Sequence, residues 1–306
     1  MTPTVKGFRK HSTFKTREAF LGLSFVTPVL AILFLFTILP LAYAFVLSFM
    51  RVNQLAGTYQ FIGFDNYLNA WNDPRVRIAL TNTLRYVLVV VPVQTVVALI
   101  MAVALNSKIN FQKTFRTVYF LPTLTSSSAL TMIFMFLFSV NGPLNAMFIE
   151  LGLMATPINF MGDISFALNT IMVMNIWATV PFYMTIYLAA LQDIPSTLYE
   201  AASLDGANTW QKLTKITVPN LVPVTNFVLL MGIIGTFQVF DQAFLVSGGT
   251  GGPANSTLTF ALVIYQYAFA TIGTMGYASA LAIILSAIIF AVSMLTRALN
   301  KEEVHY

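Results

Sequence analysis

The chain has 306 residues, of which 57% are hydrophobic and only 9% are charged. Soluble domains carry roughly 25% charged residues, so this chain has too few to cover a water-facing surface, and its mean hydropathy of +0.77 agrees. These numbers exclude a soluble enzyme, a secreted disulfide scaffold and a disordered chain, and they indicate a polytopic membrane protein. The absence of cysteine excludes disulfides and thiolate chemistry, and the two histidines, His11 and His305, lie near opposite termini.

Six segments are long and apolar enough to cross a bilayer, which requires about 20 mainly apolar residues. The predicted spans run from about Leu21 to Met50, Tyr86 to Leu105, Thr117 to Phe138, Ser165 to Leu191, Leu221 to Val246 and Met275 to Leu295. Prolines lie within or at the edges of several spans, and proline is tolerated there when neighbouring helices satisfy the freed backbone groups. We therefore predict an all-α fold, a packed bundle of six transmembrane helices.

Lysine and arginine are distributed unevenly over the segments between the spans. With the N-terminus inside, the cytoplasmic segments hold twelve of the sixteen basic residues, and the outer segments hold four, Arg51, Arg75, Arg77 and Arg85. Cytoplasmic loops carry an excess of Lys and Arg. We therefore predict that both termini are cytoplasmic, and we attribute the net charge of +5 to this bias rather than to nucleic-acid binding.

The segment between the first two spans, from Gly63 to Pro74, has an amphipathic pattern. Phe64, Tyr67, Leu68 and Trp71 have the i, i+3, i+4, i+7 spacing that places side chains on one face of a helix. We predict a short helix at the outer membrane interface. Its role is either packing over the bundle, which we favour, or binding of a partner.

Span three contains a run of small hydroxyl residues next to Pro122. These residues are Thr123, Thr125, Ser126, Ser127 and Ser128. Small hydroxyl side chains let helices approach closely and re-satisfy a backbone disturbed by proline. We predict a packing role for them.

Polar side chains also recur within spans four and five. Ionisable groups cost roughly 2.5–3.5 kcal/mol at the centre of a membrane helix, so such residues tend to face the bundle interior. Span four carries Asn175, Thr179 and Tyr183 at about one-turn spacing, and span five carries a stripe of Met231, Gly235, Gln238 and Gln242 with Asp241 beside it. Amides and aromatic rings suit the binding of sugar hydroxyls, so the candidate pathway residues are Asn175, Tyr183, Gln238, Asp241 and Gln242. The alternative is hydrogen bonding between helices, or, for Asp241, solvation near the outer surface.

The loop between spans four and five, from about Gln192 to Asn220, has the pattern of ordered helix. Thr197 and Glu200 have the spacing of a capping box, and Gly206 stands where a glycine ends a helix. A second helical stretch then leads to Pro219, which is placed to start span five. A two-helix elbow in the cytoplasm either presents a surface to a partner or only connects two spans.

A glycine cluster, Gly248, Gly249, Gly251 and Gly252 followed by Pro253, lies between spans five and six. No lysine follows it in the G-x-x-x-x-G-K-[ST] pattern of a phosphate-binding loop, and the predicted topology puts it outside the membrane. We predict a flexible outer loop. We predict neither a catalytic residue nor a metal ligand anywhere in the chain.

The elbow resembles the EAA loop of permeases of ATP-binding-cassette importers. Glu200-Ala201-Ala202, then Gly206, then Ile216-x-x-Pro219 match EAA-x3-G-x9-I-x-L-P at every spacing, with Val218 where leucine is usual. The segments Gly63–Tyr86, Phe115–Pro122, Phe237–Thr257 and Gly276–Leu285 resemble the carbohydrate-uptake, maltose-type branch. The resemblance covers roughly residues 20–298 and implies a type I importer fold.

The resemblance also implies partners and roles. The elbow residues Glu200, Ala201, Ala202, Leu204, Asp205 and Gly206 would dock onto a cytoplasmic ATPase subunit, and ATP and magnesium would be used there, with no cofactor bound by this chain. A second, different permease would complete the pathway. An external solute-binding protein would deliver the solute and contact the Gly248–Pro253 loop. The setting would be a bacterial or archaeal cytoplasmic membrane.

The predicted organisation is a cytoplasmic segment (1–19), a permease domain (20–298) with its coupling loop at about 192–220, and a cytoplasmic tail (299–306). The predicted function is binding-protein-dependent import of a sugar, with an oligosaccharide favoured and glycerol phosphate or another polyol as the alternative substrate. Because no arginine lies deep in a span, a neutral sugar is favoured.

The alternative class is an ion-coupled secondary transporter, for which Asp241 is the one candidate coupling residue. A membrane-embedded enzyme is disfavoured, because the spans hold no paired acids or histidine cluster.

Overall fold

The computed structural model describes residues 12–53, 56–107 and 112–299. Its elements, with π-helical turns labelled η, are α1 (Ser12–Leu33), η1 (Phe34–Ile38), α2 (Leu39–Leu47), β1 (Met50–Asn53), β2 (Thr58–Phe61), α3 (Asp65–Asn72), α4 (Pro74–Asn106), α5 (Gln112–Leu124), α6 (Ser127–Leu137), α7 (Pro143–Glu150), α8 (Ala167–Asp193), α9 (Ser196–Leu204), α10 (Thr209–Lys212), η2 (Leu213–Thr217), α11 (Val218–Asn220), α12 (Val222–Phe237), α13 (Asp241–Ser247), α14 (Phe260–Tyr265), η3 (Gln266–Ala270) and α15 (Met275–Leu299). The predicted terminal segments lie largely outside the described residues.

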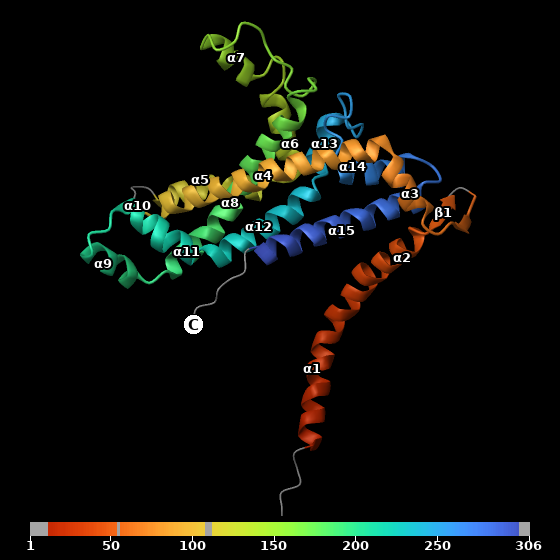
Figure 1. Cartoon of the computed structure of the whole chain (residues 1–306), viewed down its shortest axis with the longest axis horizontal. Helices are drawn as coiled ribbons and strands as arrows, with labels where there is room; N and C mark the ends of the chain where they lie inside the picture. The colour runs from red at the N-terminus through yellow and green to blue at the C-terminus, as the bar shows by residue number, and fades with distance from the viewer. Residues whose placement is uncertain (1–11, 54–55, 108–111, 300–306) are drawn as a thin grey trace, which may run out of the picture.

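Four long helices, α4, α8, α12 and α15, form the bundle (Figure 1). Helix α4 lies along α8, and α12 packs against α4, α8 and α15. The space between them is filled by fully buried side chains that include Tyr86, Ile171 and Leu281. We call the end of the bundle that carries β1, β2 and α3 the hairpin end, and the end that carries α9 to α11 the elbow end (Figure 1).

Within the described residues, five helical segments are long and apolar enough to cross a membrane, and the bent pair α5–α6 would make a sixth if it is one span. The five are Leu21–Leu47, Pro74–Asn106, Ala167–Asp193, Val222–Ser247 and Met275–Ala298. These segments confirm the predicted first, second, fourth, fifth and sixth spans. The second begins earlier than predicted, because Asp73 accepts a hydrogen bond from the Arg75 backbone nitrogen (2.8 Å) and Pro74 occupies the first helical position.

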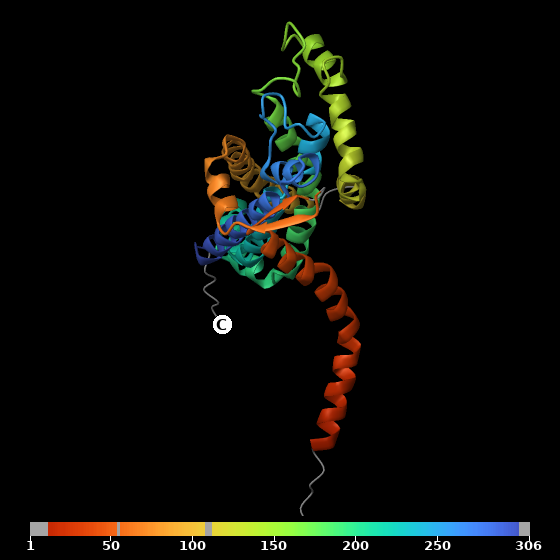
Figure 2. The same cartoon turned by 90° about the vertical axis from the view of Figure 1, so that its right-hand side faces the viewer.

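The predicted third span is not a single helix. Helices α5 and α6 meet at an angle of 101°. The Oγ of Ser126 accepts a hydrogen bond from the Ala129 backbone nitrogen (3.2 Å), so this hydroxyl begins a new helix. The prediction that the hydroxyl run only packs helices together is therefore wrong for Ser126. Helix α6 leads away from the bundle toward α7 (Figure 2).

The first span also departs from the bundle. Helix α2 packs against α15 near the hairpin end, but none of the most apolar window of the span Leu21–Leu47 is buried. Figures 1 and 2 show α1 projecting far from the other helices. Such a helix is stable only with lipid or another apolar protein surface around it.

The predicted amphipathic helix is present as α3, but it packs differently from the prediction. Asn66 and Ala70 are its buried residues, and it lies against α15. Its apolar residues Phe64, Leu68 and Trp71 are exposed. The prediction that the apolar stripe covers the bundle is therefore wrong.

Candidate translocation cavity and coupling elbow

A cavity of about 270 Å³ opens beside the break between α5 and α6. Its walls come from the end of α5, the start of α6, the middle of α8 and the start of α13; the lining residues are Pro122, Thr123, Thr125, Ser127, Leu130, Asn175, Ala178, Thr179, Phe182, Tyr183 and Gln242. None of these described residues carries a charge. The cavity exists because two spans break at neighbouring places, α5–α6 at Thr125–Ser126 and α12–α13 after Phe237.

The cavity wall contains an acceptor without a partner. Asn175 Oδ1 is buried and has no hydrogen bond within the described structure. A buried polar atom left without a partner costs roughly 1–3 kcal/mol, and a ligand hydroxyl would remove that cost. Gln242 Nε2, which also lines the cavity, donates a hydrogen bond to Ser127 Oγ (3.2 Å) and so links α13 to the start of α6.

The structure brings some of the predicted pathway residues together and leaves others apart. Asn175, Tyr183 and Gln242 line the cavity, whereas Gln238 and Asp241 do not. Helix α12 ends at Phe237, so the predicted continuous stripe on span five is interrupted between Gln238 and Gln242. Met231, Gly235 and Gln238 are instead exposed on the outside of this chain.

Sequence reasoning missed Gln94, which lies behind the cavity. Its side chain is only 1% exposed, its Oε1 is 2.8 Å from Thr179 Oγ1, and its Nε2 has no partner in the described structure. A Cβ built on Gly232 would lie 2.6 Å from that Nε2. Gln94 therefore connects α4 to the Thr179 side of the cavity, and Gly232 on α12 leaves room for it.

We expect Gly232→Ala to destabilise the protein, although alanine is normally the better helix former. The added methyl group would have to displace the Gln94 amide, and overpacking typically costs about 1–3 kcal/mol. In a Gln94→Ala background the same change should cost less, with a coupling of about 0.5–3 kcal/mol for residues in contact. Thermal unfolding of the four proteins in one detergent measures this, and strictly additive costs would contradict the contact.

The elbow consists of α9 and α10 joined at Gly206. Gly206 has φ +77°, and the backbone nitrogens of Gly206 and Ala207 donate to the carbonyls of Ser203 (3.2 Å) and Ala202 (2.8 Å). These bonds form a Schellman motif, which requires a left-handed residue and so favours glycine. The prediction that Gly206 ends the helix is therefore confirmed.

The predicted capping box at Thr197 and Glu200 is wrong. Helix α9 begins after Pro195 without a side-chain cap. The capping box lies instead at the start of α10, where Asn208 Oδ1 accepts from the Gln211 backbone nitrogen and Gln211 Oε1 accepts from the Asn208 backbone nitrogen, both at 2.8 Å. Lys212 Nζ donates to Ser203 Oγ (2.7 Å) and holds the two helices together.

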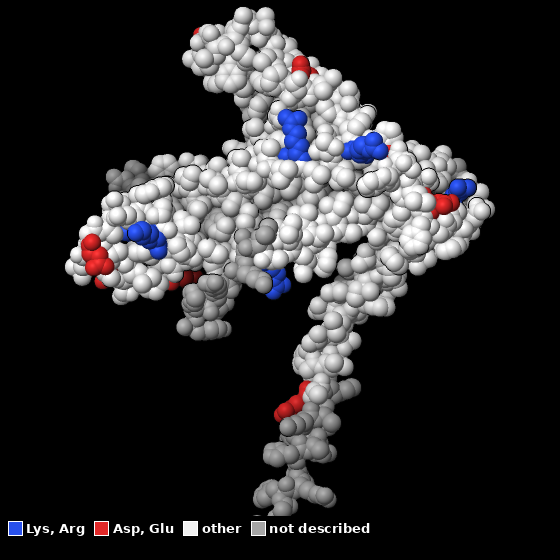
Figure 3. Space-filling model, viewed as in Figure 1, with Lys and Arg blue, Asp and Glu red and all other residues white. Residues whose placement is uncertain are grey.

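The elbow presents apolar and acidic side chains outward. Leu204 is 90% exposed, and Trp210 is also exposed. Glu200, Ala201, Asp205 and Gly206 are exposed, while Ala202 is partly buried. In Figure 3 this end shows both acidic and basic side chains, on a molecule whose visible surface is mostly uncharged. With both Leu204 and Trp210 exposed, the elbow is a candidate contact surface.

The predicted flexible loop after α13 is tied down by hydrogen bonds. The Gly251 nitrogen donates to Ser247 Oγ (3.0 Å), and Gln266 Nε2 donates to the Gly249 carbonyl (2.7 Å). A Cβ on Gly251 would lie 2.6 Å from Leu258 Cδ1. Gly248, Gly249, Gly252 and Pro253 complete this turn, which is held against Leu258 and Gln266 rather than extending freely.

Asp73 joins three elements at the hairpin end. Its Oδ2 accepts hydrogen bonds from the hydroxyls of Tyr267 (2.7 Å) and Tyr277 (3.0 Å), and its Oδ1 accepts from the Arg75 nitrogen. Burial raises the pKa of Asp73, but the hydrogen bonds to its charged form outweigh burial and hold the pKa below its usual 3.8. The charged Asp73 carboxylate therefore stabilises the folded protein fully at pH values above its usual pKa. This contribution is lost as the pH falls through the lowered pKa of the folded state.

Two kinds of comparison identify the class. The model of the family "Binding-protein-dependent transport system inner membrane component" matches residues 94–303. The crystal structure of a bacterial ABC transporter involved in the import of the acidic polysaccharide alginate has a chain that is similar with a TM-score of 0.79 and 20% identity, covering 96% of this chain and all of that one. The fold is therefore that of the membrane domain of a type I ABC importer.

Curated relatives extend over almost the whole chain. The lactose transport system permease protein LacF of Rhizobium radiobacter is 35% identical over 275 residues, which are 90% of this chain and 92% of that protein. The arabinooligosaccharides transport system permease protein AraP of Bacillus subtilis is 35% identical over 279 residues, 90% of this chain and 87% of that protein. The trehalose/maltose transport system permease protein MalF of Thermococcus litoralis is 32% identical, over 89% of this chain and 91% of that protein.

The fold and these relatives define a multi-pass membrane protein that serves as the permease subunit of a transport system. The chain belongs to the family of binding-protein-dependent transport system inner membrane components.

Proposed function

We propose that this chain forms half of the translocation pathway of an ATP-driven importer for an uncharged oligosaccharide. The cavity beside the α5–α6 break carries the proposal, because it combines an unpartnered acceptor (Asn175 Oδ1), a second amide (Gln242) and an aromatic hydroxyl (Tyr183). Sugars are recognised by such amide and aromatic groups. The names of the relatives, which refer to lactose, arabinooligosaccharides and trehalose or maltose, support the substrate class.

The elbow supports the coupling half of the proposal. Glu200, Ala201, Ala202, Leu204, Asp205 and Gly206 would contact a separate cytoplasmic ATPase subunit, where ATP and magnesium are used. The elbow end and both termini then face the cytoplasm of a bacterium or archaeon, in line with the Lys and Arg distribution.

Two further partners complete the assembly. A second, different permease would cover the exposed residues Met231, Gly235 and Gln238. It would also cover the unburied first span, which needs an apolar neighbour. An external solute-binding protein would contact the ordered turn from Gly248 to Pro253. A solved alginate importer is in complex with a periplasmic binding protein loaded with alginate pentasaccharide, and its membrane chain is similar to this one with a TM-score of 0.81 and 21% identity.

The alternatives are less well supported. Glycerol phosphate would require a cation to neutralise its phosphate, and no charged residue lines the described cavity. A secondary transporter would use an acidic residue within the pathway, but Asp241 is exposed and lies outside the cavity wall.

The test is affinity purification of the tagged chain from its native membrane in mild detergent, with the co-purifying proteins identified by mass. We expect a second permease and an ATPase subunit. The associated binding protein should then show a thermal shift with neutral oligosaccharides and none with uronate oligomers or glycerol phosphate. Isolation of the chain without an ATPase, and no crosslink to one near Glu200, would overturn the importer; a shift with acidic sugars alone would overturn only the substrate class.

A further inference from the structure

Helix α3 turns its apolar face away from the protein. Phe64, Leu68 and Trp71 are 68%, 62% and 82% exposed. The residues that α3 buries are the small Ala70 and the polar Asn66. In a surface helix of a water-soluble protein, the large apolar side chains would be buried and the asparagine would be exposed. The exposed apolar face of α3 therefore calls for an apolar environment outside this chain.

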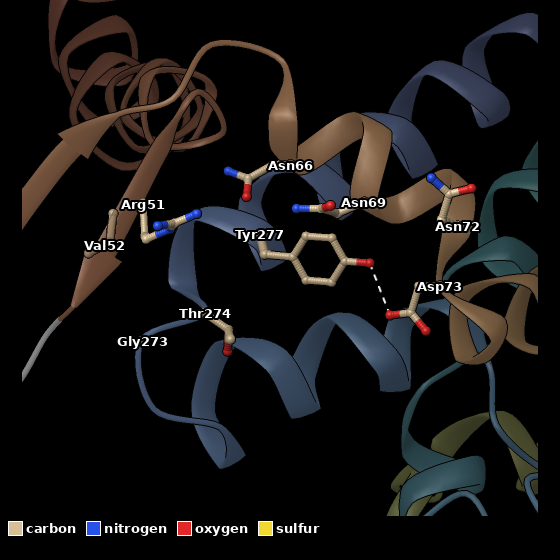
Figure 4. A pocket seen from close by; sticks show the side chains of 9 residues that line it. All are labelled: Arg51, Val52, Asn66, Asn69, Asn72, Asp73, Gly273, Thr274 and Tyr277. Atoms are coloured by element: carbon tan, nitrogen blue, oxygen red, sulfur yellow. Dashed lines mark hydrogen bonds between the residues drawn. The ribbon is translucent and has the colours of Figure 1, made fainter.

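The other side of α3 faces a polar cleft. Asn66, Asn69 and Asn72 line a cleft of about 410 Å³ together with Arg51, Asp73 and Tyr277 (Figure 4). Asn66 Nδ2 donates to the carbonyls of Ser48 (2.8 Å) and Met50 (3.0 Å), so the polar face also fixes α3 to the end of the first span. The helix thus separates a polar space on one side from an apolar surface on the other.

The apolar face of α3 is continuous with a membrane span. Exposed Phe45 of α2 lies 5.2 Å from Phe49, and Phe49 lies 5.3 Å from Phe64, measured between ring centroids. Phe45 belongs to the span Leu21–Leu47. Phe61 on the neighbouring strand β2 is exposed as well. One aromatic surface therefore runs from the hairpin end of the span onto α3.

We propose that α3 lies in the membrane–water interface at the hairpin end, with Phe64, Leu68 and Trp71 among the lipids and its asparagine face toward water. Amphipathic helices lie in this plane with their apolar face buried about 5–10 Å at the headgroup and acyl boundary, and tryptophan concentrates at that depth. Through Asn66, the lipid contact sets the depth of the end of the first span and keeps the polar cleft open to water.

Adjacent residues on α3 provide a matched test, because the chain contains no cysteine. Leu68→Cys places a nitroxide spin label on the apolar face, and Asn69→Cys places one on the cleft face. Both positions are exposed, so neither change removes a buried side chain. The complete importer is labelled and reconstituted into nanodiscs of phosphatidylethanolamine and phosphatidylglycerol, with the unsubstituted complex treated identically as background.

Electron paramagnetic resonance then compares collisions with oxygen, which concentrates in lipid, and with a neutral nickel chelate, which stays in water. We expect the label at position 68 to favour oxygen and the label at position 69 to favour nickel. Higher nickel accessibility at both positions would overturn the proposal, because α3 would then stand in water. Low accessibility of position 68 to both reagents would also overturn it, because a protein partner would then cover the apolar face.

Discussion

Replacing Leu204 with aspartate should abolish transport while the protein stays folded in the membrane. Leu204 is 90% exposed, so it contributes almost nothing to packing within this chain. Leu204 is the largest exposed apolar side chain between Glu200 and Gly206. If the elbow docks onto an ATPase subunit, loss of such a side chain from the centre of the interface costs about 2 kcal/mol or more of binding free energy. Since 1.4 kcal/mol corresponds to a tenfold change in affinity, assembly should weaken by more than about tenfold.

The matched control for this change is Leu204→Met, which keeps an apolar side chain of similar volume and should retain transport. Solute uptake into proteoliposomes, together with the amount of ATPase subunit that co-purifies, measures both variants. Thermal unfolding of the isolated chain should be the same for all three proteins. Normal uptake by the aspartate variant would show that Leu204 is outside the coupling contact.

Replacing Asn175 with leucine should raise thermal stability and lower transport together. The buried Oδ1 has no partner, so its removal relieves a desolvation cost of roughly 1–3 kcal/mol. If a substrate hydroxyl pairs with this oxygen during transport, the same change removes a hydrogen bond worth about 1 kcal/mol, and the apparent KM for uptake should rise at least about fivefold. Opposite signs for stability and transport distinguish a ligand-binding group from one that only holds helices together.

Asn145→Leu is the control for this second prediction, because it is the same substitution at an asparagine that is fully bonded. Asn145 is 1% exposed; its Nδ2 donates to the carbonyls of Ser139 (3.0 Å) and Ile158 (2.9 Å), and its Oδ1 accepts from the Ile158 nitrogen (2.9 Å). We expect this variant to lose stability. If Asn175→Leu also loses stability, Asn175 Oδ1 is not an unpaired acceptor in the folded protein. If uptake by Asn175→Leu is unchanged, Asn175 does not bind the substrate during transport.

Sequence reasoning succeeded where the signal is long and local. The five confirmed spans follow from runs of about 20 apolar residues, which only a membrane accommodates. The end of α9 at Gly206 follows from a backbone conformation that glycine adopts at low cost, here φ +77°. A cap of one or two hydrogen bonds is a weaker signal: the spacing of Thr197 and Glu200 predicts a capping box there, whereas the structure has it at Asn208 and Gln211.

Features that depend on packing between distant segments were not predictable. The pairing of Gln94 with Thr179 joins residues far apart in the chain, and the glycine that leaves room for Gln94, Gly232, lies on a third helix. The break at Ser126 was hidden because hydroxyl residues next to proline also occur in straight packed spans.

The composition and the apolar runs of this sequence determined that the chain is a helical membrane protein, and the EAA spacing determined the elbow, because each depends on residues close together in the chain. The tertiary structure decided which polar residues meet. It placed Asn175, Tyr183 and Gln242 around one cavity, left Gln238 and Asp241 outside it, and turned the apolar face of α3 outward. The physical reason is that periodicity shows which residues share a face of a helix, whereas helix breaks and crossing geometry determine what that face meets.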